Sequence, residues 1–301
     1  GCELVRVAVK DFEGANSIKK IKRKIKIPLS ADIHFDYRLA ILAMENGADK
    51  IRLNPGNIHK EDQIIAVAKL AKKLKVPIRV GVNSGSVSKA PVKNLSGLMV
   101  KKALDYIKLL EKQKFYDIIV SLKASDVLST IDAYRRFSKR SKYPVHLGIT
   151  AAGPILTGLV KSSIGIGVLL LDGIGDTIRV SLTGDPREEV FASKNILQSL
   201  GLRRFSADII SCPTCGRCQV DLEQIVGEIE TSLVHNISQV AHKKTPKIAI
   251  MGCEVNGPGE AREADIGIAF GKNSGVLFKN GKIVKRIREK DAVKTILKLT
   301  K

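Results

Sequence analysis

Short apolar segments alternate with longer segments of helical periodicity over the first two hundred or so residues. The apolar segments predict seven strands, at 4–9, 28–34, 49–53, 77–82, 117–123, 144–149 and 177–182. Between them, 61–75 carries its apolar residues, up to Leu74, on one face. Asp185-Pro186 predicts the start of a helix that runs to Gly201. This alternation is typical of an α/β fold, and seven strand–helix units are one short of a closed (βα)8 barrel of the TIM type.

The pattern changes from about residue 205. We expect strands at 207–211, 247–251 and 265–270, a helix at 221–238, a hairpin turning at Asn280-Gly281 and a last helix at 290–299. The sequence therefore predicts two domains, a TIM-type barrel at 1–204 and a smaller α+β domain at 205–301.

The chain begins with Gly1-Cys2, and the residues directly after them already have the pattern of a strand. We therefore expect a further strand and helix upstream, which would complete the barrel. No stretch approaches the ~20 apolar residues of a membrane-spanning helix, and we find no secretory segment. We expect a cytoplasmic protein without a membrane partner.

Each predicted barrel strand carries a basic or imidazole side chain, usually between apolar neighbours. These residues are Arg6, His34, Arg52, Arg79, Lys123, His146 and Arg179. Burying a guanidinium costs several kcal/mol unless it is paired, and acids such as Asp32 and Asp117 are too few to neutralise the set. The pattern predicts a multiply charged anion at the carboxyl-terminal mouth of the barrel, and a diphosphate fits better than a carboxylate. The alternative is an open, doubly wound sheet with some of these residues in solvent.

The overall charge gives a weaker indication. The chain of 301 residues has a formal net charge of +21, which is compatible with a nucleic-acid partner, an anionic substrate or simply a lysine-rich surface. Aromatic residues make up only 4% and Trp is missing, which argues against stacking platforms for nucleobases. We therefore expect no nucleic-acid partner.

Four of the five cysteines lie in two short phrases in the last third of the chain. Cys212, Cys215 and Cys218 form a C-x2-C-x2-C run, and Cys253 follows in Gly252-Cys253. A disulfide framework is unexpected in a chain of this length without a secretory segment. The spacing favours an iron–sulfur centre, but zinc held by all four cysteines, and inert or redox-active thiols, stay open as alternatives.

Several phrases carry a resemblance to a known family. They are ADIHFDYR at 31–38, RLNPGNI at 52–58, RVGVN at 79–83, SLKAS at 121–125, CPTC at 212–215 and GCEVNGPGE at 252–260. The chain resembles the bacterial two-domain 4-hydroxy-3-methylbut-2-en-1-yl diphosphate synthase family of non-mevalonate isoprenoid biosynthesis, without the family's first strand and helix. The resemblance covers essentially the whole chain.

The resemblance implies an iron–sulfur oxidoreductase. Its reaction would be reductive ring opening and dehydroxylation of 2-C-methyl-D-erythritol 2,4-cyclodiphosphate, with two electrons passing through a 4Fe-4S cluster. It implies Cys212, Cys215, Cys253 and Glu260 as cluster ligands, with Cys218 as a bystander or substitute. It also implies flavodoxin or ferredoxin as electron donor and a head-to-tail homodimer.

The resemblance also implies the residues that contact the substrate. The substrate-binding candidates are Arg6, Arg52, Arg79, Asn83, Lys123, Arg179 and Ser181, and the catalytic candidates are Glu260, Lys123 and Asn83. His34 and His146 are as well explained by local packing or hydrogen bonding.

The chain departs from the family at one position. Where the family has Gly-x-Thr-Glu-Ala-Gly, this chain has Gly148-Ile149-Thr150-Ala151-Ala152-Gly153, so the glutamate expected near the substrate is Ala151. Two further hypotheses therefore stand beside the reductase: an inactive homologue, and a zinc-stabilised basic protein that binds nucleic acid.

Overall fold

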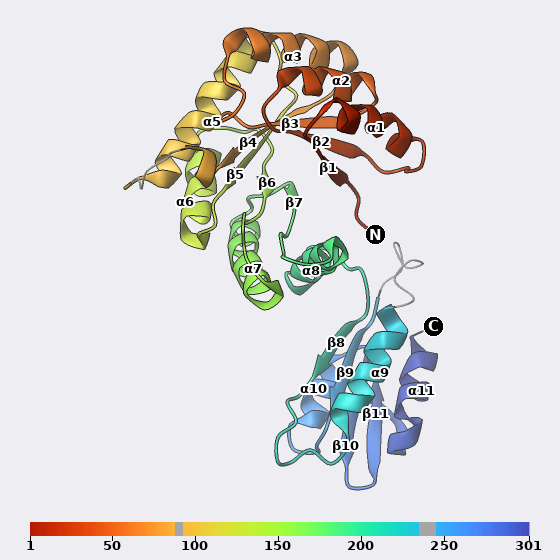
Figure 1. Cartoon of the computed structure of the whole chain (residues 1–301). Coiled ribbons are helices and arrows are strands. Elements are labelled where there is room, and N and C mark those ends of the chain that lie inside the picture. Colours follow the sequence, from red (N-terminus) through yellow and green to blue (C-terminus); the bar gives the residue numbers. More distant parts are fainter. Residues whose placement is uncertain (88–92, 235–244, 301) are drawn as a thin grey trace. The chain divides into compact units, whose positions relative to one another are not determined.

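The computed structural model describes residues 1–87, 93–234 and 245–300, and the chain divides into two compact units (Figure 1). The first is Gly1–Ile196 and the second is Leu197–Lys301. Each unit has its own sheet or sheets, and we describe the units separately.

The first unit contains the seven expected strands, all parallel to their neighbours. They are β1 (Val5–Val9), β2 (Leu29–Ile33), β3 (Lys50–Leu53), β4 (Ile78–Asn83), β5 (Ile118–Lys123), β6 (His146–Leu147) and β7 (Thr177–Ile178). The first five form one sheet in the order of the sequence, and β6 pairs with β7. The last two strands are much shorter than the sequence predicts. β7 and β1 do not pair with each other, and no described strand pairs with both of them. The described strands therefore do not form a closed barrel between β7 and β1.

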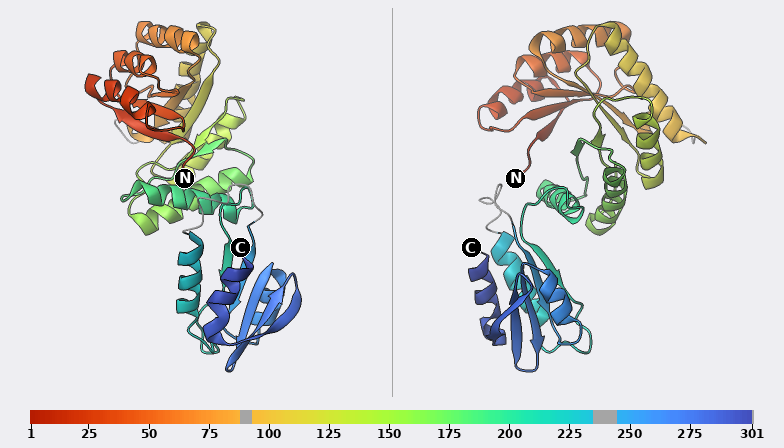
Figure 2. Two further views of the ribbon diagram at one scale, coloured as in Figure 1. Left: turned by 90° about the vertical axis from the view of Figure 1, so that its right-hand side faces the viewer. Right: turned by 180° about the vertical axis from the view of Figure 1, so that it is seen from behind.

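Helices alternate with these strands. They are α1 (Phe12–Lys22), α2 (Tyr37–Glu45), α3 (Glu61–Leu74), the short α4 (Ser84–Val87), α5 (Leu95–Lys112), α6 (Val127–Ser138), α7 (Ile155–Leu171) and α8 (Pro186–Ser199). The helices that follow β1 to β5 cover only the outer, convex face of the sheet (Figure 2). A doubly wound sheet has helices on both faces, so that alternative is wrong.

The apolar face of α3 follows the predicted periodicity, with one exception. In α3, Ile64, Val67, Ala68 and Ala71 are buried, but Leu74 at the end of the helix is 41% exposed. Several helices start where an Asp or Asn side chain accepts a backbone N–H of the first turn, as Asp126 does from Ser129 at 2.6 Å. At α8, Asp185 accepts the N–H of Arg187 in the same way, and Gly201 with φ +68° follows the helix, as predicted.

A buried tyrosine joins β5 to β6, where the two strands share only the bridge between Val120 and Val145. The Tyr134 hydroxyl donates to the His146 carbonyl oxygen at 2.6 Å and accepts the Leu122 N–H at 3.0 Å. This side chain of α6 therefore fixes the start of β6.

The second unit is built on a mixed five-stranded sheet. Its strands are β8 (Asp208–Ser211), β9 (Lys247–Met251), β10 (Ile266–Gly271), β11 (Ser274–Lys279) and β12 (Lys282–Ile287), in the order β12-β11-β10-β9-β8. β8, β9 and β10 are parallel, whereas β11 is antiparallel to both of its neighbours. The predicted hairpin turn is confirmed, because Asn280 and Gly281 both have positive φ, +48° and +78°.

Within the described residues of this unit, three α-helices accompany the sheet. They are α9 (Leu222–Val234), α10 (Gly257–Glu263) and α11 (Ala292–Leu299), the last preceded by a 3-10 turn, η2 (Glu289–Asp291). The expected end of the first helix, 235–238, lies outside the described residues. The sequence did not predict α10, because two glycines read as a loop; Pro258 is tolerated since it stands in the first turn.

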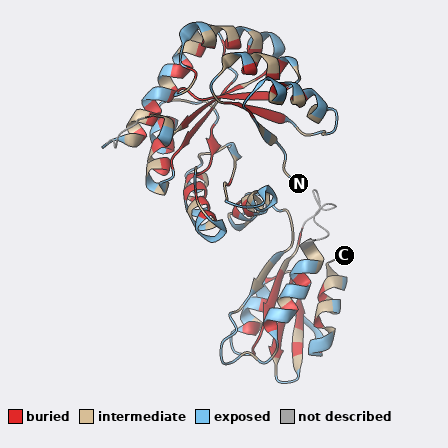
Figure 3. Ribbon diagram, viewed as in Figure 1, coloured by how far each residue is buried: buried red, intermediate tan, exposed pale blue. Residues whose placement is uncertain are grey.

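Burial follows the layers in both units. The central strands are buried, and the outer helix faces are exposed (Figure 3). None of the helices in the described parts of the chain has the length and apolar content that crossing a bilayer demands.

We predict that Tyr134→Phe lowers the free energy of unfolding by about 2 kcal/mol, because it leaves the buried N–H of Leu122 without an acceptor. Chemical denaturation monitored by circular dichroism measures this loss. Tyr116→Phe is the matched control, since Tyr116 is 61% exposed and should be neutral. Equal stability of the two variants would contradict the role assigned to the Tyr134 hydroxyl.

Candidate functional site

A polar cavity of about 310 Å³ lies at the carboxyl ends of the strands in the first unit. Its lining residues are Arg6, Asp32, His34, Arg52, Asn54, Asn57, Arg79, Asn83, Lys123, Thr150, Arg179 and Ser181. All seven substrate-binding candidates named from the sequence are among them, so the structure brings the complete set together. His34 also lines the cavity, whereas His146 is buried and does not.

Strand alternation explains how the side chains reach the cavity. Successive residues of a strand point to opposite faces, so Lys50, Arg52 and Asn54 all project from the same face at β3. Asn54 lines the cavity, and Lys50 is buried with 6% exposure. Neither residue was predicted from the sequence, although both stand two positions from Arg52 on the same strand face.

One carboxylate bridges two of the arginines. Asp32 on β2 accepts a hydrogen bond from Arg52 at 3.0 Å and forms an ion pair with Arg6 at 3.1 Å. Burial alone would raise the pKa of Asp32, but the neighbouring guanidiniums of Arg52, Arg6 and Arg79 outweigh it and lower the pKa. Asp32 therefore neutralises part of the set, whereas Asp117 is exposed and takes no part.

Two glycines make room for the cations. A Cβ atom at Gly81 would lie 2.3 Å from Arg52 Nε, and Arg52 Nη2 donates to the Gly81 carbonyl oxygen at 2.8 Å. A Cβ atom at Gly148, which has φ +154°, would lie 2.6 Å from Lys123 Nζ and 2.4 Å from the Arg179 carbonyl oxygen. The long cationic side chains thus lie directly against the backbone, which only glycine permits.

The remaining arginines have polar partners of different kinds. Arg79 is 3% exposed and donates to the Ser121 hydroxyl at 2.6 Å. Burial, with Arg52 and Arg6 nearby, lowers the pKa of Arg79 to about 9, which leaves it cationic at neutral pH. Arg179 contacts Glu189 of α8 at 3.5 Å.

Besides Arg79, the buried nitrogen groups of Lys123, His146 and Lys50 have strongly lowered pKa values. Burial and the guanidiniums around it, Arg79 foremost, hold the pKa of Lys123 well below its usual range. Burial, with Lys123 nearby, does the same to His146, whose Nδ1 lies 2.9 Å from the Thr177 hydroxyl. Burial and Arg79 lower the pKa of Lys50 to about 8. The interior of the sheet therefore resists further positive charge.

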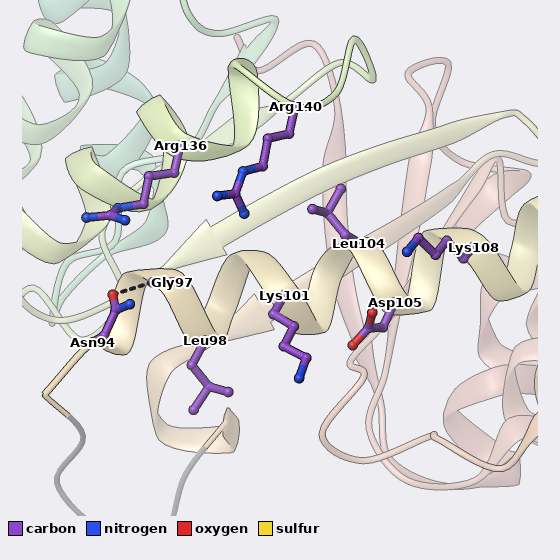
Figure 4. A pocket seen from close by; sticks show the side chains of 9 residues that line it. All are labelled: Asn94, Gly97, Leu98, Lys101, Leu104, Asp105, Lys108, Arg136 and Arg140. Carbon is purple, nitrogen blue, oxygen red and sulfur yellow. Dashed lines mark hydrogen bonds between the residues drawn. The ribbon is translucent and has the colours of Figure 1, made fainter.

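A larger hollow of about 540 Å³ lies elsewhere, between α5 and the end of α6 (Figure 4). It is lined by Asn94, Gly97, Leu98, Lys101, Leu104, Asp105, Lys108, Arg136 and Arg140. None of these belongs to the residues named from the sequence, and all lie on the outer helical layer. Asn94 is the amino-terminal cap of α5, which accounts for its hydrogen bond with the Gly97 N–H. The smaller cavity, where the strand ends converge, is the candidate site.

In the second unit, both cysteine phrases lie at one edge of the sheet. Cys212 directly follows β8, and Cys253 follows β9 after one residue; these strands are parallel neighbours. The Gly252 N–H donates to Cys212 Sγ at 3.2 Å. Backbone N–H groups, that of Val255 first, lower the pKa of the Cys253 thiol despite its burial.

These observations test whether the residues suit an iron–sulfur cluster. Thiolate is the form that binds iron, and backbone N–H groups aimed at sulfur favour it. Glu260 lies in the first turn of α10, which begins four residues after Cys253. Within residues 1–87, 93–234 and 245–300, no three Cys, His, Asp or Glu side chains are close enough to hold a metal ion. These residues therefore offer ligand atoms that suit a cluster, and they lie at the same edge of the sheet. Their side chains are not close enough to one another to hold a metal ion.

Two family models match the chain. The GcpE TIM-barrel domain covers residues 1–194, and the GcpE protein C-terminal domain covers residues 208–301. The chain belongs to the GcpE family. Curated relatives include the 4-hydroxy-3-methylbut-2-en-1-yl diphosphate synthase (flavodoxin) of Caldanaerobacter subterraneus subsp. tengcongensis, 53% identical over 99% of this chain and 83% of the relative. The protein of the same name from Clostridium perfringens is 51% identical over 99% of this chain and 85% of the relative.

Family membership confirms the fold class expected from the sequence, a TIM-type barrel followed by a smaller domain. In this GcpE chain, Ala151 is exposed and has φ +49°, in the left-handed region. It stands one residue after Thr150, whose backbone N–H donates to the Ala124 carbonyl oxygen at 3.0 Å. The loop that carries Ala151 is thus tied to the end of β5, next to Lys123.

We predict that Lys50→Met raises the free energy of unfolding of this GcpE protein by about 2 kcal/mol near pH 7. The folded state must keep Lys50 charged below its pKa of about 8, whereas the unfolded chain holds that proton up to about 10.5. Between these values the unfolded state binds more protons, so the wild type gains stability as pH rises and the difference between the proteins narrows. Chemical denaturation at several pH values measures this difference in the free energy of unfolding.

Lys102→Met is the matched control, because Lys102 is exposed on α5. It should leave stability unchanged at every pH. A loss of stability in Lys50→Met, or a gain that does not depend on pH, would contradict the burial of an uncompensated charge at Lys50.

Proposed function

We propose that this chain is a 4-hydroxy-3-methylbut-2-en-1-yl diphosphate synthase, which opens the ring of 2-C-methyl-D-erythritol 2,4-cyclodiphosphate by reduction. The reaction takes up two electrons and one proton, breaks two C–O bonds, forms one C=C bond and releases water. The observation that carries the proposal is the cavity in which Arg6, Arg52, Arg79, Lys123 and Arg179 converge. The names of relatives about half identical to this chain support the same reaction.

The charge balance of the cavity suits a cyclic diphosphate. Its five cationic side chains face two carboxylates, Asp32 in the lining and Glu189 behind Arg179. When all are ionised, three positive charges remain, and the substrate brings negative charge spread over several oxygens. Attraction between buried charges is weakly screened, so binding the substrate relieves repulsion among the cations.

The cations are held before the substrate arrives. Asp32 and the Gly81 carbonyl oxygen fix Arg52, and the Ser121 hydroxyl fixes Arg79. Guanidiniums bind diphosphate oxygens with several N–H donors each. Asn83 and Ser181 add neutral donors and acceptors to the lining, and we propose that they bind hydroxyl groups of the substrate. Preorganised donors of this kind stabilise the charge that develops as the ring opens.

In the second unit, Cys212, Cys215, Cys253 and Glu260 would hold a 4Fe-4S cluster. The bound cluster would supply electrons one at a time, and its carboxylate-held iron would act as a Lewis acid. The N–H groups directed at Cys212 and Cys253 support this assignment. Cys218 Sγ lies against Gly252, where a Cβ atom would be 2.4 Å away, and donates to the Val220 carbonyl oxygen. We assign Cys218 to packing rather than to the cluster.

The proposal includes partners and boundaries. Flavodoxin is the electron donor named for the relatives, and we propose a flavodoxin or a ferredoxin for this chain. We also propose a head-to-tail homodimer in the cytoplasm and a boundary between barrel and cluster domain at residues 204 and 205.

We predict that Cys253→Ala abolishes both the brown colour and the turnover of anaerobically reconstituted protein, because the cluster loses one of its thiolates. Visible absorption, iron and sulfide content and reduction of the cyclic diphosphate with a reduced viologen measure this.

Cys2→Ala is the matched control, since Cys2 lies outside both cysteine phrases, and it should retain colour and turnover. One zinc per chain without labile sulfide would favour the zinc-stabilised alternative. A full cluster without turnover in the wild type would favour the inactive homologue.

A further inference from the structure

Lys123 differs from the other cations of the cavity in what surrounds it. It is 6% exposed, and within the described parts of the chain no carboxylate forms a salt bridge with it. Asp32 pairs with Arg6 and Arg52, and Glu189 with Arg179. Lys123 is therefore a buried amine that lacks an anionic partner until one enters the cavity.

Basic groups and one carboxylate face Lys123 from most of the strands around it. They are Arg6 on β1, Asp32 on β2, Arg52 on β3, Arg79 on β4, His146 on β6 and Arg179 after β7. Cations predominate in this set, so the free protein favours the neutral amine. A bound diphosphate brings negative charge close to Lys123 and so favours its ammonium form.

The cavity offers few other proton donors. Asp32 is held ionised by its two arginines, and guanidiniums do not release protons at neutral pH. Apart from Lys123 and the arginines, His34 is the one basic side chain of the described lining, and it is only partly buried. No unpaired carboxylate belongs to the described lining.

We infer that Lys123 is the acid that protonates the leaving hydroxyl group, and that the substrate's own diphosphate charges this lysine on binding. The inference rests on the proposed function, which supplies the two electrons. The Lys123 ammonium gives its proton to the hydroxyl oxygen, the C–O bond breaks and water leaves while the C=C bond forms. The neutral amine that remains is stabilised by the arginines around it and regains a proton from solvent.

Binding of inorganic pyrophosphate tests the charging step without the reaction. Titration calorimetry in buffers of different ionisation enthalpy measures protons taken up per ligand. Near pH 8 we expect more protons to be taken up per ligand in the wild type, and in the matched control Lys102→Arg, whose lysine is exposed, than in Lys123→Arg. In Lys123→Arg the guanidinium is positively charged both before and after binding. This variant should therefore bind pyrophosphate with most of the proton uptake lost. An undiminished uptake in Lys123→Arg, or none in the wild type, would overturn the inference.

If Lys123→Arg does not bind pyrophosphate, a second measurement tests the charging of Lys123. In the wild type labelled with 13C at the lysine ε carbon, the signal that disappears in Lys123→Arg belongs to Lys123. Its titration midpoint should lie well below the usual 10.5 in the free protein and rise when pyrophosphate is added. A midpoint near 10.5 without ligand would refute the charging step.

The reaction itself gives the third test. In reconstituted enzyme, Lys123→Arg should lower kcat by about 100-fold or more, as expected for loss of a general acid. Ala151→Glu, which places a carboxyl group on the loop beside Lys123, should restore part of the loss. Unchanged kcat in Lys123→Arg would contradict the acid role. An inactive wild type would instead refute the proposed function and leave the proton uptake measurable.

Discussion

The excess of positive charge inside the first unit is the constraint on which the rest of the structure depends. Each of its seven strands, or the residue just after it, carries a basic group, and most of these point into one cavity. Burying such charges without partners costs several kcal/mol each. Asp32 partners two arginines, and Gly81 and Gly148 let the longest side chains lie flat against the backbone. The remaining charge is left for a ligand.

This arrangement separates stability from function. Lys50 and Lys123 are buried with lowered pKa values and weaken the fold that contains them. Well-packed apolar residues at such positions would give a more stable protein. The same uncompensated field attracts a diphosphate, orients it and tunes the acidity of Lys123. The second unit differs from the first in its chemistry. It places thiols at one edge of its sheet, and backbone N–H groups are directed at two of them.

Local patterns in the sequence predicted the strand count, the hairpin and the basic residues of the cavity, because periodicity and residue type act locally. Pairing across strands is not local, so the bridge from Asp32 to two arginines could not be found in this way. The helix at 257–263 was missed because its glycines resemble a loop, although Gly257 packs closely against Met251 and Ala269. Lys50 was not predicted, although strand alternation places it on the same face as Arg52.

Thermal unfolding of the ligand-free protein with added inorganic pyrophosphate tests the central claim most directly. If uncompensated cations in the cavity await a multiply charged anion, pyrophosphate should raise the melting temperature by several degrees. Chloride at the same ionic strength should do much less, because it only screens the charges. An equal rise with both salts would show that no such site exists.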